Sequence, residues 1–418
     1  MHGEIIAIGD ELVAGRVRNT TSSFAAGQLF QAGYRLDCIT TIGDDAGAIK
    51  TSLLTAVGRS AFVIVTGGLG PTSDDMTSEA VAAALGRGLV LNKEVLKKIE
   101  AEKGRWGGTP GRMLEKLAIL PDGAEFLNPD GRAAGYLIIE RGVFIFCLPG
   151  VPDELEYLFM NQVIPRLNNA FGSRFAARQR TFKTFGLQET EINALLEWRI
   201  RDMEWIKIGY YPSFPEVFIT ISMMDPDNGA ADRRFASACS TIEAALAENL
   251  IGADEDTQES MVGKLLLEKG ATLAVAESCT GGLLAHRITS VAGSSLWFER
   301  GVVSYSNRSK EEMLGVLLET IANFGAVSRN TGIEMADGAK RIAGSTYSIA
   351  VTGFAGPGGG TPHDPVGTVY IAIGAPESTF CQRFSFQGSR CAIQTMSAET
   401  ALDWLRRYLK YDADIYSH

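Results

Sequence analysis

Histidine is scarce in this chain of 418 residues, which has only four, at positions 2, 286, 363 and 418. Because none lies between residues 3 and 285, catalytic chemistry in that stretch must use carboxylates, lysine or a metal ion rather than imidazole. The six cysteines, at positions 38, 147, 239, 279, 381 and 391, form no CxxC pair. Free thiols in a reducing compartment are therefore a better interpretation than a disulfide framework or a zinc site.

Long apolar runs and a basic leader are also missing, which predicts neither a membrane span nor a signal peptide and favours a cytoplasmic protein. Positive charge is in short supply, with 39 Lys and Arg against 49 Asp and Glu and a net charge of −10. The arginine-rich stretch at 174–180, RFAARQR, is best interpreted as a solvated face. Since this charge repels a nucleic-acid backbone, we expect small phosphorylated molecules as partners, with no nucleic acid and no membrane.

Three segments differ in their patterns. Residues 1–168 alternate strand-like runs that end in glycine (EIIAIG, FVIVTGG, FIFCLPG) with helical patterns, residues 169–252 have the mixed pattern of a small α+β module, and residues 253–418 alternate again. Such alternation predicts parallel sheets covered by helices. The expected fold class is therefore α/β, with two α/β domains of mainly parallel sheets joined by a small α+β domain. Their strands should end near Gly9, Gly67 and Pro149 in the first, and near Glu277, Ser304 and Thr352 in the second.

The loop TGGLGPTSDDMT, at 66–77, is the richest candidate site in the first segment. Its glycines let backbone N–H groups approach a phosphate, and its two adjacent acids suit a divalent cation such as Mg²⁺. We expect phosphate contacts from Gly67, Gly68, Gly70 and Thr72, and metal ligation by Asp74, Asp75 and Glu11. The competing interpretation is that the paired acids only cap helices, which we prefer for Asp153 and Glu154.

The stretch AESCTGG, at 276–282, places Ser278 and Cys279 between a strand-like and a helical run. A nucleophile at such a turn is exposed, and N–H groups around Thr280, Gly281 and Gly282 would hold an oxyanion. The alternative is that Ser278 or Thr280 caps the helix over a tight glycine turn. Lys310, in GVVSYSNRSK, would serve as the base if burial lowers its pKa. A rival arrangement pairs Cys279 with His363, which Asp364 would orient.

These motifs resemble those of the CinA family of competence/damage-inducible proteins over essentially the whole chain. TGGLGPTSDDMT, NPDG and LPGVPDEL resemble the family's amino-terminal domain, which is related to molybdopterin-binding domains. AESCTGG, VAGSS, GVVSYSNRSK, VTGFAGPGGG and PVGTV resemble its carboxy-terminal nicotinamide-nucleotide amidase domain. The middle segment corresponds to a KH-like domain but lacks the GxxG loop that clamps RNA, so RNA binding is not expected.

The resemblance implies two activities. The carboxy-terminal domain would deamidate nicotinamide mononucleotide without a cofactor, and the amino-terminal domain would hydrolyse the pyrophosphate of ADP-ribose with a divalent metal. It also implies a homodimer. Its amidase residues correspond to Ser278 as nucleophile, Lys310 as base and Tyr305 as a catalytic partner. Substrate contacts are expected from Thr280, Gly281, Gly282, Ser294, Asn307, Thr352, Gly353 and Arg390.

The alternatives are a nucleotide- or pterin-binding module without turnover at the amino-terminal site, or a protein-interaction role in competence and DNA damage. The sequence also departs from the family at four positions, with Ala134, Ala292, Arg300 and Asp364 where the family usually has other residues. Arg300 and Asp364 would alter how the nucleotide phosphate is held, so they bear on substrate preference more than on the chemistry.

Overall fold

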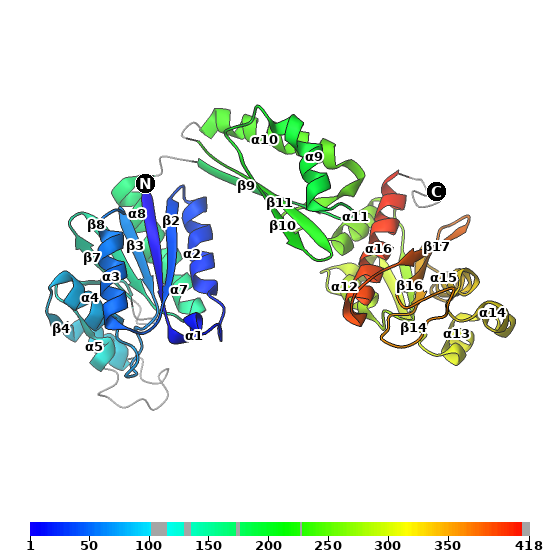
Figure 1. The fold of residues 1–418 in the computed structure, drawn as a ribbon, viewed down its shortest axis with the longest axis horizontal. Coiled ribbons are helices and arrows are strands. Elements are labelled where there is room, and N and C mark those ends of the chain that lie inside the picture. Colours follow the sequence, from blue (N-terminus) through cyan, green and yellow to red (C-terminus); the bar gives the residue numbers. More distant parts are fainter. Residues whose placement is uncertain (102–114, 129–134, 173–175, 226–227, 412–418) are drawn as a thin grey trace. The chain divides into compact units, whose positions relative to one another are not determined.

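The computed structural model describes residues 1–101, 115–128, 135–172, 176–225 and 228–411. The chain divides into two compact units, Met1–Arg178 with Met223–Phe235, and Gln179–Ser222 with Ala236–His418. Three main sheets organise it (Figure 1). The Ala134 departure and most of the NPDG motif lie outside the described residues.

A six-stranded sheet in the order β2-β1-β3-β8-β7-β6 forms the amino-terminal domain (Figure 1). Strands β2, β1, β3 and β8 are parallel, and β7 and β6 are antiparallel to their neighbours. Its elements are β1 (His2–Ile8), α1 (Asp10–Val13), α2 (Thr20–Gln31), β2 (Arg35–Ile42), α3 (Ala46–Val57), β3 (Phe62–Thr66), α4 (Thr77–Leu85), β4 (Leu89–Leu91), α5 (Lys93–Ala101), β5 (Ile119–Pro121), β6 (Glu125–Phe126), β7 (Tyr136–Glu140), β8 (Val143–Leu148), α7 (Pro152–Leu158), η2 (Phe159–Val163) and α8 (Ile164–Phe171).

Alternating residues of the central strands build a core on each face of this sheet. Ile6 and Val65 pack with α3 and α4 on one face. Ile5 and Ile64 pack with α2, α7 and α8 on the other. Because both faces are covered, β1 is buried at every position after His2 and β3 at every position, as in a buried parallel strand.

The middle segment forms a four-stranded sheet in the order β10-β11-β9-β12 (Figure 1). Strands β10 and β11 form an antiparallel hairpin, and β12 pairs antiparallel with β9. Its elements are β9 (Ala176–Thr184), α9 (Glu189–Ile200), β10 (Lys207–Ser213), β11 (Glu216–Asp225), α10 (Asn228–Leu246), η3 (Ala247–Asn249) and β12 (Leu250–Ala253).

The carboxy-terminal domain is a five-stranded sheet in the order β14-β13-β15-β16-β17. Strands β14, β13 and β15 are parallel, and β16 and β17 antiparallel. Its elements are α11 (Gln258–Glu268), β13 (Leu273–Glu277), α12 (Leu283–Thr289), η4 (Ser294–Leu296), β14 (Phe298–Val303), α13 (Asn307–Leu314), α14 (Leu318–Phe324), α15 (Arg329–Ala343), β15 (Tyr347–Gly353), β16 (Thr368–Gly374), β17 (Thr379–Ser385) and α16 (Arg390–Tyr411).

Helices cover both faces of this sheet too. Val275 and Ile349 pack with α11, α12 and α16, whereas Ala274 and Ala350 pack with α13 and α15 on the opposite face. The expected fold class, two helix-covered α/β domains and a small α+β domain, is confirmed. No helix of the described residues is long and apolar enough to cross a membrane.

Both α/β domains have the same strand-order reversal, at which a ligand crevice is expected outside the carboxyl edge of the sheet. In each, the first strand lies between the second and the third (β2-β1-β3 and β14-β13-β15), so consecutive connections leave toward opposite sides. Ligands of open α/β sheets bind outside the strand ends at such a reversal point. The predicted strand ends are confirmed within a residue or two, because β1, β3 and β8 end at Ile8, Thr66 and Leu148, and β13, β14 and β15 at Glu277, Val303 and Gly353.

Candidate active sites

At the carboxyl edge of the carboxy-terminal sheet, hydrogen bonds join the ends of β13, β14 and β15. Ser278 N–H donates to Val351 O over 2.9 Å, and Ser304 N–H donates to Glu277 O over 2.8 Å. Ser278 therefore directly follows β13, whose end is held by both neighbouring strands, β14 and β15. Helix α12 leaves on one face and helix α13 on the other, so the two helices that carry candidate groups meet at this edge.

Ser278 and Lys310 are brought together although they lie 32 residues apart in sequence. Lys310 Nζ is 2.9 Å from Ser278 Oγ and donates a second hydrogen bond to Ser304 O over 2.8 Å. Lys310 is 1% exposed and Ser278 8%. A serine hydroxyl in contact with a buried amine is the geometry in which lysine can act as a general base.

The position of Lys310 follows from the start of α13. Ser306 caps this helix by accepting from Ser309 N–H, which places Lys310 on its inward face within the first turn. Burial lowers the pKa of Lys310 from 10.5 to about 8, because the charged form is disfavoured away from water. A substantial neutral fraction is thus available near physiological pH.

Glu277 organises the turn that carries Ser278, and the sequence analysis gave it no role. Its carboxylate is 0% exposed and accepts three backbone N–H groups, from Gly282 (2.9 Å), Leu284 (3.0 Å) and Ala285 (2.8 Å). These are N–H groups at the start of α12, which have no partner within the helix. The acid at the strand end was visible in AESCTGG, but its partners depend on how the turn folds.

The hydrogen bonds of this turn show that two of the expected oxyanion donors, the amides of Gly281 and Gly282, are already engaged. Gly282 N–H donates to Glu277, and Gly281 N–H donates to Ser278 O over 3.2 Å. Neither amide is therefore available to an oxyanion in this conformation. Both glycines have positive φ, 62° at Gly281 and 99° at Gly282, so the tight-turn interpretation accounts for them.

Cys279 is an unsuitable nucleophile. It packs into the core beneath α12 and is 5% exposed, and burial raises the pKa of its thiol to about 12. His363, its proposed partner, has a side chain that is 85% exposed and contacts Asp364. The rival arrangement of Cys279 with His363 is therefore not supported.

Tyr305 and Arg390 form a separate pair in the structure. Arg390 donates to Tyr305 Oη over 2.8 Å and to Gly356 O over 2.6 Å, so it joins the loop after β14 to the glycine-rich loop after β15. No hydrogen bond between Tyr305 and either Ser278 or Lys310 is present in the described residues. Tyr305 is 60% exposed and accessible from outside the crevice.

The side chains of two residues that were expected to contact the substrate, Thr352 and Thr280, are buried in the fold. Thr352 is fully buried and its hydroxyl donates to Ala326 O over 2.8 Å, which uses it inside the fold. Thr280 is 3% exposed, and its hydroxyl has no hydrogen-bond partner within the described part of the chain. Both side chains are thus sealed from a substrate.

Ser294, another expected substrate contact, lies at the amino edge of the sheet, opposite to the edge that carries Ser278. It precedes Trp297, whose carbonyl accepts from Leu273 N–H at the amino end of β13. Ser278 follows the carboxyl end of the same strand, roughly 16 Å away for a strand of five residues. Of the remaining positions, Asn307 is exposed at the start of α13, and Gly353 ends β15 beside the crevice.

The structure also places two of the residues that depart from the family pattern, Asp364 and Arg300. Asp364 accepts from Arg383 Nε over 2.8 Å, and the hydrogen bonds from Arg383 and His363 outweigh partial burial to lower its pKa. This contact joins the loop before β16 to β17. Arg300 is exposed in β14.

The amino-terminal crevice has a cavity volume of 430 Å³. It lies outside the carboxyl ends of β1, β3 and β8 and beside the start of α2. Its lining comprises Ile8, Gly9, Glu11, Leu12, Val17, Arg18, Thr20, Thr21, Asp44, Thr66, Gly67, Gly68, Leu69, Gly70, Pro71, Asp74, Asp75, Leu117, Pro149, Gly150, Val151, Pro152 and Glu154. Asp75 and Gly150 therefore lie at the same end of the sheet, as expected.

The glycines of this crevice are required by close packing. A Cβ on Gly67 would lie 2.1 Å from Ile8 O, and one on Gly68 would lie 2.3 Å from Thr77 Oγ1. Gly67 N–H donates to Leu148 O over 3.1 Å, so it cannot also contact a phosphate. The expected phosphate donor at Gly67 is corrected accordingly, whereas Gly68 and Gly70 line the cavity.

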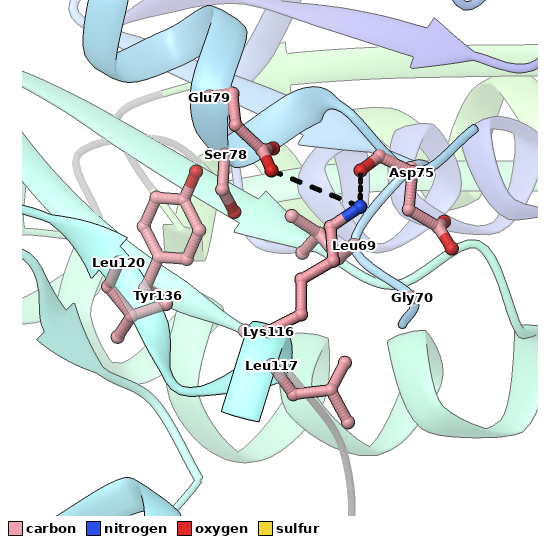
Figure 2. Close-up of a pocket in the computed structure, with 11 residues that line it drawn as sticks. Leu69, Gly70, Asp75, Ser78, Glu79, Lys116, Leu117, Leu120 and Tyr136 are labelled. Carbon is pink, nitrogen blue, oxygen red and sulfur yellow. Dashed lines mark hydrogen bonds and ion pairs between the residues drawn. The ribbon is translucent and has the colours of Figure 1, made fainter. Parts of the chain in front are cut away.

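Thr72, Asp75 and Lys116 hold the loop in shape. Both the N–H and the hydroxyl of Thr72 donate to Asp75 Oδ2. Figure 2 shows Lys116 reaching between the Glu79 carboxylate, 3.9 Å away, and the backbone carbonyl of Asp75, with the Asp75 carboxylate pointing elsewhere. Thr72 thus binds the loop itself, and one Asp75 oxygen is already engaged.

Asp44 belongs to this crevice and was missed by the sequence analysis. Its carboxylate accepts from Asp10 N–H (2.9 Å), and its own N–H donates to Asp10 Oδ1 (3.1 Å). Burial raises the pKa of Asp44, and the nearby charges of Glu11 and Asp74 raise it further. The signal was present in TIGDDA, where a strand-like run ends in glycine and is followed by two acids.

The donor chemistry of this crevice suits a divalent cation that is shared with a phosphate substrate. The carboxylates of Glu11, Asp44 and Asp74 line one cavity, and oxygen ligands suit Mg²⁺. Within the described residues no three acidic, histidine or cysteine side chains converge into a ready-made metal centre. Mg²⁺ is commonly held by one or two carboxylates together with substrate phosphates, and the crevice fits that mode.

Three family models match consecutive parts of the chain. They are described as a probable molybdopterin binding domain at residues 4–169, the damage-inducible protein CinA KH domain at 179–252, and the CinA C-terminal domain at 255–409. A CinA-like protein from Desulfotalea psychrophila is 45% identical over 410 residues, which cover 98% of this chain and 99% of that protein. A CinA-like protein from Citrifermentans bemidjiense is 42% identical over 411 residues, 98% of each chain.

Among solved structures, the competence damage-inducible protein A from Klebsiella pneumoniae is 35% identical, with a TM-score of 0.36. The match covers 37% of this chain and 96% of that one. The full-length likeness to curated relatives and the three consecutive domain matches agree with the motifs and with the fold. The chain belongs to the CinA family.

Proposed function

We propose that the carboxy-terminal domain is an amidase that converts nicotinamide mononucleotide and water into nicotinate mononucleotide and ammonia. The contact between Ser278 Oγ and Lys310 Nζ, 2.9 Å long and buried, carries this proposal. It supplies a nucleophile and a base, and the family resemblance supplies the substrate. The dyad requires no cofactor.

The reaction divides into two steps. Neutral Lys310 takes the hydroxyl proton of Ser278 while Oγ attacks the carboxamide carbon, and the resulting ammonium delivers that proton to the departing ammonia. The acyl-enzyme ester that remains is then cleaved by water, which Lys310 deprotonates before returning the proton to Ser278. Arg390 and Tyr305, which lie together beside the crevice, are suited to contact the ribose phosphate.

Ammonia release from nicotinamide mononucleotide by the purified protein tests this proposal. Ser278→Ala and Lys310→Ala should each abolish release, and the double variant should lose little more, because the two residues act as a unit. Cys279→Ala should remain active as the matched control. An inactive Cys279→Ala together with an active Ser278→Ala would instead make the thiol the nucleophile.

We further propose that the amino-terminal domain hydrolyses the pyrophosphate of ADP-ribose with a divalent cation. The 430 Å³ crevice, its acidic lining and its place at the strand-order reversal support this activity. One or two of the carboxylates of Glu11, Asp44 and Asp74 would hold the ion together with the substrate phosphates, and a bound divalent cation would neutralise charge on the pyrophosphate. Arg18 is suited to pair with a phosphate at the same crevice.

AMP release from ADP-ribose, measured with Mg²⁺ and with EDTA, tests this second activity. Asp74→Asn should lower turnover by orders of magnitude and spare the amidase. Asp75→Asn should also lower it, partly by loosening the loop that Thr72 holds. Binding of ADP-ribose without any AMP release would favour the alternative of a nucleotide- or pterin-binding module.

A further inference from the structure

We propose that the amidase oxyanion is held by the backbone N–H groups of Cys279 and Thr280, and that Glu277 and Gln394 are the positioning residues that aim them. This inference rests on the proposed amidase function and specifies the donors at that same site. It replaces the amides of Gly281 and Gly282, which the structure engages elsewhere.

Glu277 is an unusual acceptor for a helix start. Helices are commonly capped by a short polar side chain at the residue before the first turn, but that residue of α12 is Gly282, which has no side chain. The acceptor comes instead from the end of β13, five to eight residues earlier in sequence. One carboxylate therefore joins the strand end to the helix start and fixes both ends of the intervening turn.

The peptide planes inside that turn are fixed through their carbonyl groups. Ser278 O accepts from Gly281 N–H over 3.2 Å, and Cys279 O accepts from Gln394 Nε2 over 2.7 Å. A trans peptide is planar, and its N–H points opposite to its C=O. Anchoring the carbonyls of Ser278 and Cys279 thus determines the direction of the N–H groups of Cys279 and Thr280.

Neither N–H group donates to another of the described residues, in contrast to the amides on either side. Ser278 N–H donates to Val351 O, and Gly281 N–H to Ser278 O. In nucleophile turns between a strand and a helix, the N–H of the residue after the nucleophile is an oxyanion donor. Here that residue is Cys279.

Glu277 and Gln394 act by positioning the two N–H groups. Their substitution should therefore lower kcat by more than the loss of folding stability explains. Glu277→Gln keeps the size of the side chain but puts an NH₂ group against N–H donors, and Gln394→Ala frees the Cys279 carbonyl. Removal of one oxyanion donor costs roughly 100- to 1000-fold in kcat. We expect displaced donors to cost roughly 10- to 100-fold in kcat, with KM for nicotinamide mononucleotide within about twofold of wild type.

Ser328→Ala is the matched control. Ser328 caps α15 in the same domain by accepting from Thr331 N–H, so its loss should lower Tm without changing kcat. A second readout is the labelling rate of Ser278 by a fluorophosphonate, followed by intact mass, since the phosphoryl oxygen needs the same donors. This rate should fall in Glu277→Gln and Gln394→Ala and be unchanged in Ser328→Ala.

The outcomes separate the two proposals. Wild-type protein that is labelled at Ser278 but releases no ammonia would reject the proposed substrate, and the labelling rates would still test the donors. Folded Glu277→Gln and Gln394→Ala proteins with wild-type kcat and labelling rate would overturn the inference. The inference would also be overturned if Glu277→Gln and Gln394→Ala lost no more kcat than Ser328→Ala does at the same Tm. If Glu277→Gln fails to fold, Gln394→Ala decides.

Discussion

Amidase activity should follow a single ionisation near pH 8 that belongs to Lys310. Only the neutral amine can accept the Ser278 proton, and burial lowers the pKa of this lysine from 10.5 to about 8. We therefore expect kcat/KM to rise through pH 8 and to level off above pH 9. The phosphate of the substrate titrates at about pH 6, so it is constant over this range.

The magnitude follows from the two pKa values. At pH 7 a base of pKa 8 is neutral in about one molecule in 11, whereas a pKa of 10.5 would leave about one in 3000. Burial therefore raises the concentration of active base roughly 300-fold at pH 7, equivalent to about 3 kcal/mol. Between pH 7 and pH 9 the rate should increase about tenfold.

Initial rates of ammonia release between pH 7 and 9.5 measure this profile. Lys310→Arg should be inactive throughout, because its guanidinium stays charged. Lys340→Met is a matched control, since Lys340 donates to Ala375 O at the opposite edge of the sheet and its loss should leave the midpoint unchanged. A rate that is flat over this range, or a Lys310→Met variant within about tenfold of wild type, would refute the assignment of Lys310 as base.

Two further predictions concern stability. The unfolded state retains the Lys310 proton up to about pH 10.5 and the folded state only to about pH 8, so folding stability should rise with pH between these values. Urea denaturation at pH 7.5 and at pH 9.5 measures this effect. The free energy of unfolding of wild type should rise by about 2 kcal/mol more than that of Lys310→Met between the two pH values. An equal change in both proteins would contradict the lowered pKa of Lys310. Gly67→Ala should destabilise the amino-terminal domain by more than about 1 kcal/mol, because φ is 102° and the new Cβ would lie 2.1 Å from Ile8 O. Gly86→Ala is the milder comparison, because its φ of 64° lies in the left-handed region that other residues can adopt and no atom lies within 4 Å of the new Cβ, so its Tm should fall less than that of Gly67→Ala.

The sequence predicted the architecture well because its signals were local. Apolar runs that end in glycine located the strand ends, and the order of strands and helices implied parallel sheets. The meeting of Ser278 with Lys310 was expected from the family resemblance and is present in the structure. The catalytic roles of these residues stay predictions.

Other features depended on contacts that spacing does not reveal. The partners of Glu277 and Gln394 are set by a folded turn and by α16, and the place of Asp44 is set by the pairing of β1 with β2. Ser294 shows a different limit, because its motif was taken to contact the substrate without asking which edge of the sheet it reaches. A residue that follows a crossover helix and precedes the next parallel strand lies at the amino edge, and this rule would have excluded it.

In the proposed amidase, the direction of attack and the working pH depend on different parts of the chain. The nucleophile, the proposed oxyanion donors and the carboxylate that holds the start of α12 all come from nine consecutive residues, 277–285, to which α16 adds Gln394. The base comes from another helix, and its pKa is set by burial among distant parts of the chain. If the proposed amidase function holds, substitutions around Lys310 should move the working pH up or down and leave the geometry of attack unchanged, because that geometry depends on residues 277–285 and Gln394.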